Sequence, residues 1–339
     1  MRRNPCIALI AACVIAPAFA QRPAYEVTHT VPLGAPDRWD YVVFDPGSHR
    51  VYVAHGDRVT VVDGVTGSII GQVEGYPGGT HGIAVVASLG RGFTDDGEAG
   101  EAGEFDLATL KTSKRIKTAV DADGMVFDPV SGHVFVVNGD NGTVSVIDPK
   151  LEQAVATVQA GEKLETPVAG QDGKVYVNGA GNREILRIDT RSNRIDARWP
   201  VPDCESPHGI AIDPQARRLF ASCVNKVLVA VNLNSGAVVA TVPIGAGTDA
   251  AAFDPRRKRI FSSNGRDGTL SIIEEKDPQT FVPLATIDTT ISARTMALNP
   301  ETGRLYLVAA DVDAKASAAG AKRAFIAGSL KLLFLDPTP

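Results

Sequence analysis

The chain has 339 residues, and its 39 acidic and 34 basic side chains give a formal net charge of −5. Binding to nucleic acid phosphates needs clustered lysine and arginine, so this acidic balance argues against nucleic acid as the main partner. After the first twenty residues no segment is apolar enough to span a bilayer. The composition therefore argues against an apolar membrane-spanning segment after residue 20 and disfavours nucleic acid as the main partner.

The first twenty residues are typical of a secretory signal. They combine two arginines with an apolar run and a small-x-small sequence that ends at Ala20. We expect cleavage near Ala20, which removes residues 1–20 and leaves residues 21–339 as a periplasmic or secreted protein. The apolar run is too short for a transmembrane helix. Cleavage as a lipoprotein at Cys13 ranks second, because Cys13 lies early in the apolar run.

Two cysteines, Cys204 and Cys223, remain after the signal is removed. Export places them in an oxidising compartment, where paired cysteines form disulfides. Cys204 precedes the first strand of a predicted hairpin and Cys223 ends the second strand, so we expect them to be bonded. A redox pair is less favoured, because the sequence has no Cys-x-x-Cys, and metal binding through both thiols is a weaker alternative.

A repeat of an apolar strand, a turn and a second strand runs along the chain. Five copies are clear, as in "VVFDPGSHRVYVA" and "MVFDPVSGHVFVV", and two degenerate copies, "IAVVASLGRGFTD" and "PVAGQDGKVYVNG", fill the gaps between them. The turn position recurs every 41–45 residues, at Asp45, Val86, Asp128, Gly170, Asp213, Asp254 and Asn299. The chain therefore contains seven units of one kind.

Each unit continues in the same way. A loop rich in Asn and Gly, such as "NGDNG", leads to a third strand, and a fourth strand such as "AVVATVPIG" follows. Four short strands at this period predict an all-β, seven-bladed β-propeller with four antiparallel strands per blade. The last unit lacks a fourth strand, and residues 25–34 resemble one. We expect this N-terminal strand to complete the C-terminal blade, so that residues 21–339 form one closed domain.

The segment "VFVVNGDNGTVSVIDPKLEQAVATV" resembles the repeat of the YVTN-type β-propellers, the YncE-like exported proteins of bacterial envelopes. The resemblance runs from about Tyr25 to Pro337. It is interrupted by an insertion at about 311–329, whose composition predicts a flexible loop. The resemblance implies the seven-bladed fold and says little about function. Some family members are implicated in binding, including nucleic acid, and related propellers include lactonases and lyases.

An ionisable residue stands five positions before the turn of every repeat, whereas the positions on either side show no such bias. The first strand of a propeller blade lines the central channel, so we expect these side chains to form one layer at the channel mouth. We call this layer the collar. Its members are Asp40, His81, Asp123, Glu165, His208, Asp249 and Arg294.

The collar places four carboxylates in one layer. Two such charges about 4 Å apart repel by about 1–4 kcal/mol, depending on how wet the site is. This repulsion favours a bound cation, raised carboxyl pKa values or a protonated histidine. The candidate ligands for one divalent metal ion (Zn²⁺, Mn²⁺, Fe²⁺ or Ca²⁺) are His81, His208, Glu165 and Asp249. Each imidazole precedes a glycine, which we expect to leave room for the ring.

Three functions fit the sequence. The first is an exported binding module that holds a small ligand, a metal ion or an envelope protein at the channel mouth. The second, ranked below it, is a metal-dependent lactonase or lyase that uses the same residues, although no catalytic residue is assigned. The third is a ligand-free scaffold for protein contacts, with a polar, water-filled channel. We expect a monomer, because a closed ring has no free sheet edge.

Overall fold

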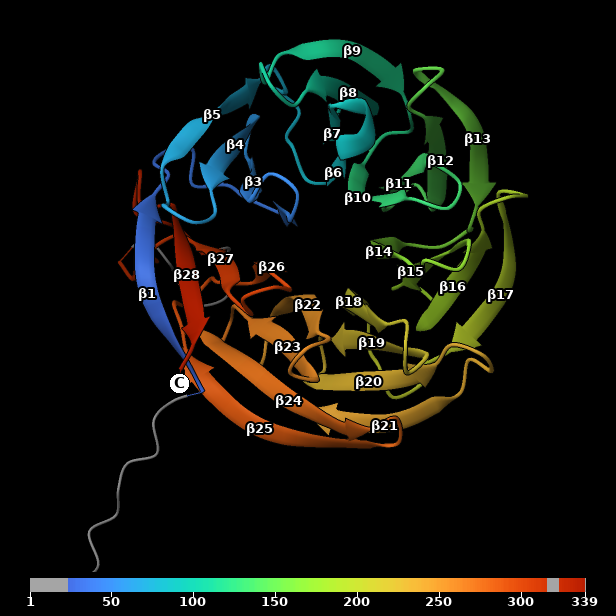
Figure 1. Cartoon of the computed structure of the whole chain (residues 1–339), viewed down its shortest axis with the longest axis vertical. Helices are drawn as coiled ribbons and strands as arrows, with labels where there is room; N and C mark the ends of the chain where they lie inside the picture. Colours follow the sequence, from blue (N-terminus) through green and yellow to red (C-terminus); the bar gives the residue numbers. More distant parts are fainter. Residues whose placement is uncertain (1–23, 316–322, 339) are drawn as a thin grey trace, which may run out of the picture.

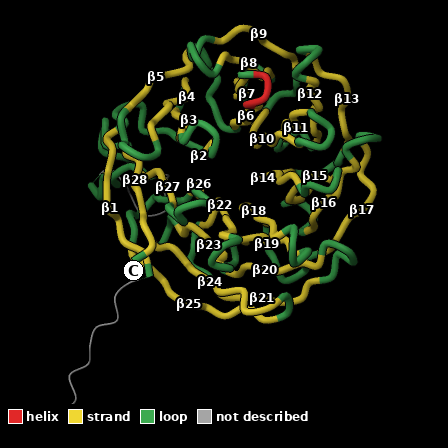
Figure 2. The backbone as a smooth tube through the Cα atoms, viewed as in Figure 1, coloured by secondary structure: helices red, strands yellow, loops and turns green. Residues whose placement is uncertain are grey.

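The computed structural model describes residues 24–315 and 323–338, so the predicted signal peptide lies outside the described residues. Seven four-stranded sheets are arranged in a ring around a central axis (Figure 1). Figure 2 shows that nearly all regular structure is strand, with a single 3-10 helix, η1 (Ala87–Leu89), in the described part of the chain. The predicted all-β, seven-bladed propeller is confirmed. No helix among residues 24–315 and 323–338 combines the length and hydropathy that a membrane crossing requires.

Blades 1 to 6 each use four consecutive antiparallel strands, numbered from the central axis outwards. Blade 1 consists of β2 (Val42–Asp45), β3 (Arg50–His55), β4 (Arg58–Asp63) and β5 (Ile69–Glu74). Blade 2 consists of β6 (Ile83–Val86), β7 (Arg91–Asp96), β8 (Glu101–Asp106) and β9 (Thr112–Lys117). Blade 3 consists of β10 (Ala122–Asp128), β11 (His133–Asn138), β12 (Thr143–Asp148) and β13 (Gln153–Gln159).

The next three blades repeat this order. Blade 4 consists of β14 (Leu164–Ala169), β15 (Lys174–Gly179), β16 (Glu184–Asp189) and β17 (Arg194–Pro200). Blade 5 consists of β18 (Pro207–Asp213), β19 (Arg218–Cys223), β20 (Val227–Asn232) and β21 (Val238–Pro243). Blade 6 consists of β22 (Thr248–Asp254), β23 (Arg259–Asn264), β24 (Thr269–Asp277) and β25 (Thr280–Asp288).

Blade 7 joins the two ends of the chain. Its inner strands are β26 (Thr295–Leu298), β27 (Leu305–Ala309) and β28 (Lys331–Pro337), and its outermost strand is the N-terminal β1 (Tyr25–Pro32). β1 pairs antiparallel with β28, from Tyr25 opposite Pro337 to Pro32 opposite Lys331, as the blue and red strands in Figure 1 show. The predicted ring closure is therefore confirmed. It covers the edge of β28, which would otherwise offer unpaired backbone groups to another chain.

The second strand of every blade contributes one fully buried aromatic ring at the same repeat position. Burying one such ring stabilises the fold by about 2–3 kcal/mol, and the rings lie in the apolar layers between neighbouring blades. The turn before this strand is fixed by the repeated Asp or Asn, whose side chain accepts backbone N–H bonds two and three residues ahead. The seven rings are Tyr52, Phe93, Phe135, Tyr176, Phe220, Phe261 and Tyr306.

The described ends of the predicted insertion lie against the channel mouth. Val312 forms an isolated β-bridge with Phe325, and the Phe325 ring packs 5.2 Å from Trp39. The carboxylate of Asp37 accepts the backbone N–H groups of Gly328 and Leu330 at 2.6 and 2.8 Å. Residues 323–330 therefore form part of the wall beside blade 1.

The inner strands of adjacent blades approach so closely that a side chain would not fit between them. A Cβ atom on Gly209 would lie 2.4 Å from the carbonyl carbon of Ala250, and one on Gly82 would lie 2.1 Å from the backbone carbonyl oxygen of Asp123. The sequence predicts that Gly82 and Gly209 leave room for the imidazole rings. The space beside them is instead filled by the backbone of the next blade. The His81 ring instead lies against Gly97, where a Cβ atom would be 2.7 Å from Cε1.

We predict that Gly209→Ala lowers the free energy of unfolding by about 1–3 kcal/mol, because the new methyl group must push two backbones apart. Gly47→Ala is the matched control, since its Cβ would approach nothing closer than 3.6 Å and would leave stability nearly unchanged. Denaturant-induced unfolding measures both. Equal unfolding midpoints for the two variants would contradict the close approach of the inner strands.

Cys204 and Cys223 are joined by a disulfide, as predicted, and both are fully buried in blade 5. The bond links residues 19 apart in sequence. Closing a loop of this size removes conformational freedom from the unfolded chain and stabilises the fold by about 3 kcal/mol.

We therefore expect the Cys204→Ala/Cys223→Ala double variant to lose about 3 kcal/mol of unfolding free energy. Denaturation in the presence of a reductant is the control. The reductant should lower the stability of the native protein to that of the variant and leave the variant itself unchanged. A variant as stable as the native protein would show that the bond contributes nothing.

Candidate functional site

Two adjoining cavities lie at the channel mouth, with volumes of about 900 Å³ and 240 Å³. We call them the large and the small cavity. Asp40, His208, Asp249 and Arg294 line both, so the two spaces share a boundary. His81 lines the large cavity, and Asp123 and Glu165 line the small one. The structure therefore brings together all seven collar residues, which are about forty residues apart in sequence; that they bind a ligand stays a prediction.

His81 is held by a carboxylate that the sequence analysis did not single out, that of Asp95 on β7. Asp95 is fully buried. One of its oxygens accepts the imidazole Nδ1–H at 2.8 Å, and the other accepts the backbone N–H groups of His81 and Gly82 at 2.9 and 2.7 Å. The ring is thereby fixed before any ligand arrives, with Nε2 left free of this bond.

This pair carries charge at neutral pH. Burial opposes a charged His81, but the hydrogen bond and charge of Asp95, with the charges of Asp40 and Asp123, raise the pKa of His81 to about 9. Burial raises the pKa of Asp95 to about 6, although its bonds from His81 and Gly82 favour the ionised form. Between these values Asp95 is a carboxylate and His81 an imidazolium, so the pair is neutral overall and its cationic member lines the large cavity.

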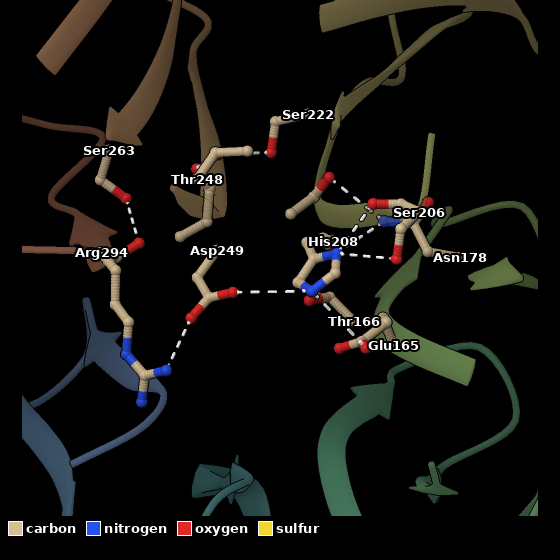
Figure 3. Close-up of polar contacts among 12 residues, drawn as sticks. Glu165, Thr166, Asn178, Ser206, His208, Ser222, Thr248, Asp249, Ser263 and Arg294 are labelled. Atoms are coloured by element: carbon tan, nitrogen blue, oxygen red, sulfur yellow. Dashed lines mark hydrogen bonds and ion pairs between the residues drawn. The ribbon is translucent and has the colours of Figure 1, made fainter. Parts of the chain in front are cut away.

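His208 is oriented by the backbone and faces two acids (Figure 3). Its Nδ1–H donates to the carbonyl oxygen of Ser206 at 2.8 Å. Its Nε2 lies 3.7 Å from Glu165 Oε1 and 4.0 Å from Asp249 Oδ1, which is too far for direct hydrogen bonds. Nε2 of His208 therefore stands between two carboxylates at the boundary of the two cavities.

Arg294 closes the same network on the side of blade 7. Its Nη1 lies 3.0 Å from Asp249 Oδ2, and its Nη2 donates to the Trp39 carbonyl oxygen at 2.7 Å. The guanidinium also lies 5.5 Å from the centre of the Trp39 ring, at cation–π distance. Trp39 itself is buried and packs between blades 1 and 7, and it also lines the large cavity.

The small cavity is strongly acidic. Six carboxyl groups line it, together with Lys163, Arg294 and His208. Burial, reinforced by the charge of Asp40, raises the pKa of Asp123 well above its ordinary range. Burial also raises the pKa of Glu165, against the opposing charges of His208 and Lys163, and raises that of Asp249 to about 6, against Arg294.

The large cavity has a different character. Four arginines line it with Trp39 and Phe325, and the described ends of the insertion supply Arg323 and Phe325. Arg323 donates to the carbonyl oxygens of Gly265 and Arg266, at 3.0 and 3.1 Å. The insertion therefore builds one wall of this cavity. The four arginines are Arg38, Arg266, Arg294 and Arg323.

The arrangement does not fit a metal centre formed by several side chains. Within the described ranges, no three His, Cys, Asp or Glu residues converge in a way that could hold a metal ion. The predicted ligands His81, His208, Glu165 and Asp249 lie around the cavities, but His81 is bound to Asp95 and does not join the other three. Metal binding therefore gains no support from the geometry and stays a prediction.

A signal for Asp95 was present in the repeat. The equivalent position of the other second strands holds an uncharged residue in every blade, so a carboxylate there stands out: these residues are Ala54, Val137, Asn178, Ser222, Ser263 and Val308. No repeat position in the sequence points to the residues that the insertion adds to the cavity wall. Arg323 and Phe325 lie outside the repeat, and only the folded chain shows where they end up.

Comparisons with known proteins support the fold and a distant YncE-like similarity. No protein-family model matches the chain, so membership of the YVTN family stays a prediction. The chain is 25% identical over 191 residues to "Uncharacterized protein YncE" of Salmonella typhimurium and equally to the protein of that name from Salmonella typhi. Each alignment covers 54% of this chain and 52% of the relative, so the chain spans about half the length of the curated relatives it matches.

Two solved structures are similar in fold alone. A chain from the Kuenenia stuttgartiensis hydrazine synthase structure has a TM-score of 0.70 at 14% identity, over 82% of this chain and 92% of that one. A chain from a mitotic checkpoint complex has a TM-score of 0.76 at 15% identity, over 100% of this chain and 99% of that one. The fold and the similarity to YncE together indicate a propeller that acts as a binding or scaffold module.

We predict that Asp95→Asn lowers the pKa of His81 from about 9 towards its ordinary value of 6.5, because the variant keeps the shape of the partner and removes its charge. A titration of the histidine Cε1–H signals by NMR measures this pKa. Asp96→Asn is the control, because Asp96 bonds the backbone of Ala99 and not His81. An unchanged His81 titration in Asp95→Asn would contradict the pairing.

The same pair makes stability depend on pH. Folding raises the pKa of His81 above its unfolded value, so its contribution is complete below about pH 6.5 and is lost as pH rises through about 9. The unfolding free energy of the native protein should therefore fall across this window. Asp95→Asn should lose that part of the slope, whereas Asp96→Asn should keep it.

Proposed function

We propose that this protein is an exported β-propeller binding module that holds a small ligand at its channel mouth. The observation that carries the proposal is that every blade supplies one ionisable collar side chain to two contiguous cavities. The large cavity, at about 900 Å³, falls within the range of about 300–1,000 Å³ that small-molecule sites occupy. It also combines aromatic rings with several converging charged groups, which is typical of such sites.

The polar groups of the site are held in place by the protein itself. Asp95 fixes His81, the Ser206 carbonyl fixes His208, and Asp249 with the Trp39 carbonyl fixes Arg294. Binding to side chains that are already held in position costs less conformational entropy than binding that must first order those side chains. A water-filled structural channel needs no such orientation, so this arrangement favours binding over an empty scaffold.

Export is part of the proposal and rests on residues 1–20. The disulfide between Cys204 and Cys223 agrees with an oxidising compartment. Cell fractionation with sequencing of the mature N-terminus tests it. A chain beginning at Gln21 in the periplasm or medium would support export, and an uncleaved chain confined to the cytoplasm would refute it.

Acid–base catalysis by His81 is a second candidate function. Asp95 orients its imidazole and its pKa lies near 9, so at neutral pH it is a proton donor towards the large cavity. Lactone hydrolysis or elimination by a lyase are reactions that use such a donor. Turnover of a lactone panel that is lost in His81→Gln would favour this candidate; binding without turnover would favour the module.

We predict that a library of small molecules spanning anionic, cationic and neutral classes contains ligands that raise the melting temperature in a saturable manner. Asp40→Asn should weaken the binding of a cationic ligand by about tenfold or more and strengthen that of an anionic one, because the Asp40 carboxylate lies at the boundary of both cavities. Asp203→Asn, an exposed carboxylate away from the cavities, is the matched control and should bind normally. If no molecule of any class binds, the protein is a scaffold and the proposal is wrong.

A further inference from the structure

We infer that the large cavity binds a small aromatic acid, with its carboxylate or phosphate group at the arginine-rich wall and its ring beside Trp39 and Phe325. This inference rests on the proposed function and names the chemical class of the ligand. It draws on three features of the cavity: unneutralised positive charge, an aromatic wall, and an acidic layer on one side.

The positive charge of the cavity exceeds its negative charge. Four arginines line it against three aspartates, in a protein whose net charge is −5. Arg38 and Arg266 form no side-chain hydrogen bond or ion pair with the described residues, and the bonds of Arg323 go to neutral carbonyl oxygens. Arginine guanidinium groups left without a carboxylate are suited to bind one, or a phosphate, through paired N–H bonds.

The aspartates of the cavity are largely occupied. Asp37 accepts two backbone N–H groups of the insertion, and Asp249 pairs with Arg294. The imidazole of the His81–Asp95 pair also faces this wall, and a Cβ on Gly79 would lie 3.5 Å from both the His81 ring and the Arg38 guanidinium. His81 and Arg38 thus flank one point of the wall, where an anion would meet two cationic groups.

The aromatic wall supplies the second requirement. The rings of Trp39 and Phe325 lie 5.2 Å apart at an angle of 58°, and Phe325 is only partly buried. Arg294 lies against Trp39, so an anion near this guanidinium places the rest of its molecule beside the rings. An aromatic ligand gains contact area and favourable edge or face packing there, which inorganic anions cannot.

The acidic small cavity prevents an anion from moving beyond the large cavity. Its six carboxyl groups outnumber Lys163 and Arg294, so it repels a negative group. Asp40 lies on the boundary between the cavities, and its carboxylate makes no hydrogen bond or ion pair with the described residues. An acid is thereby confined to the large cavity, and ligands with a free amine gain no comparable site on the arginine wall.

Isothermal titration calorimetry with the mature protein tests this inference with five probes. Benzoate and phenyl phosphate carry a ring and an anion, benzyl alcohol is neutral, benzylamine is cationic, and inorganic phosphate lacks the ring. We expect benzoate or phenyl phosphate to bind with a Kd of about 1 mM or tighter. The other three should bind at least about tenfold more weakly. The two ring-bearing anions distinguish a carboxylate from a phosphate ligand.

A pair of charge-matched variants locates the anion. Arg38→Gln/Arg266→Gln should weaken binding of the preferred probe by about tenfold or more, because each arginine lost removes a charge-assisted hydrogen bond. Arg191→Gln/Arg194→Gln removes the same charge from the exposed β16–β17 hairpin and should bind normally. Phe325→Leu should weaken the ring-bearing anions and leave inorganic phosphate unaffected. Thermal unfolding of each variant checks that the fold is retained.

The outcomes separate this inference from the function on which it rests. Tighter binding of benzylamine than of benzoate, equal binding by the two double-arginine variants, or no binding of either ring-bearing anion would overturn the aromatic acid. If other molecules then bind in a manner that depends on Asp40, the binding module stands with a different ligand. If nothing binds, both fail.

Discussion

The structure depends on the closure of the ring by one strand pair. β1 and β28 join the ends of the chain within a single sheet, so each blade has a neighbour on both sides. Only a closed ring places seven first strands around one axis, and only then do residues about forty positions apart become neighbours. The close packing of these strands, seen at Gly82 and Gly209, fixes the distance between adjacent collar residues. The site is therefore a product of the closure rather than of any one blade.

The protein gathers many carboxyl groups at the channel mouth, and ion pairs reduce the electrostatic cost of this arrangement. Carboxyl groups gathered in a partly dry layer repel one another, and the raised pKa values of Asp123, Glu165 and Asp249 record that repulsion and burial. Two ion pairs, His81 with Asp95 and Arg294 with Asp249, offset part of it. Carboxyl groups with perturbed pKa values cluster at functional sites of proteins, which agrees with a binding role for the channel mouth.

The insertion in the last blade adds side chains to the cavity that the repeats do not supply. The repeat places one charged residue from each blade on the channel, but Arg323 and Phe325 reach the cavity from outside the repeat. The similar structures share the ring at about 15% identity, and a common ring carries no common chemistry. What distinguishes the cavity is therefore the side chains added to the shared fold, with the wall beside Trp39 as the clearest case.

The repeat pattern was enough to predict the number of blades, the four strands in each, the closing role of the N-terminal strand and the residues of the collar. It was enough because repeat spacing and turn chemistry are local properties that any one unit displays. The bond between Cys204 and Cys223 was also predicted, because these two cysteines remain after signal removal and lie at one predicted hairpin. Three features emerged only from the folded chain: Asp95 fixes His81, the collar residues line a cationic and an acidic cavity, and the insertion completes the wall. These contacts join residues through space in directions that no sequence period encodes, because they depend on which way each side chain points once the ring has closed.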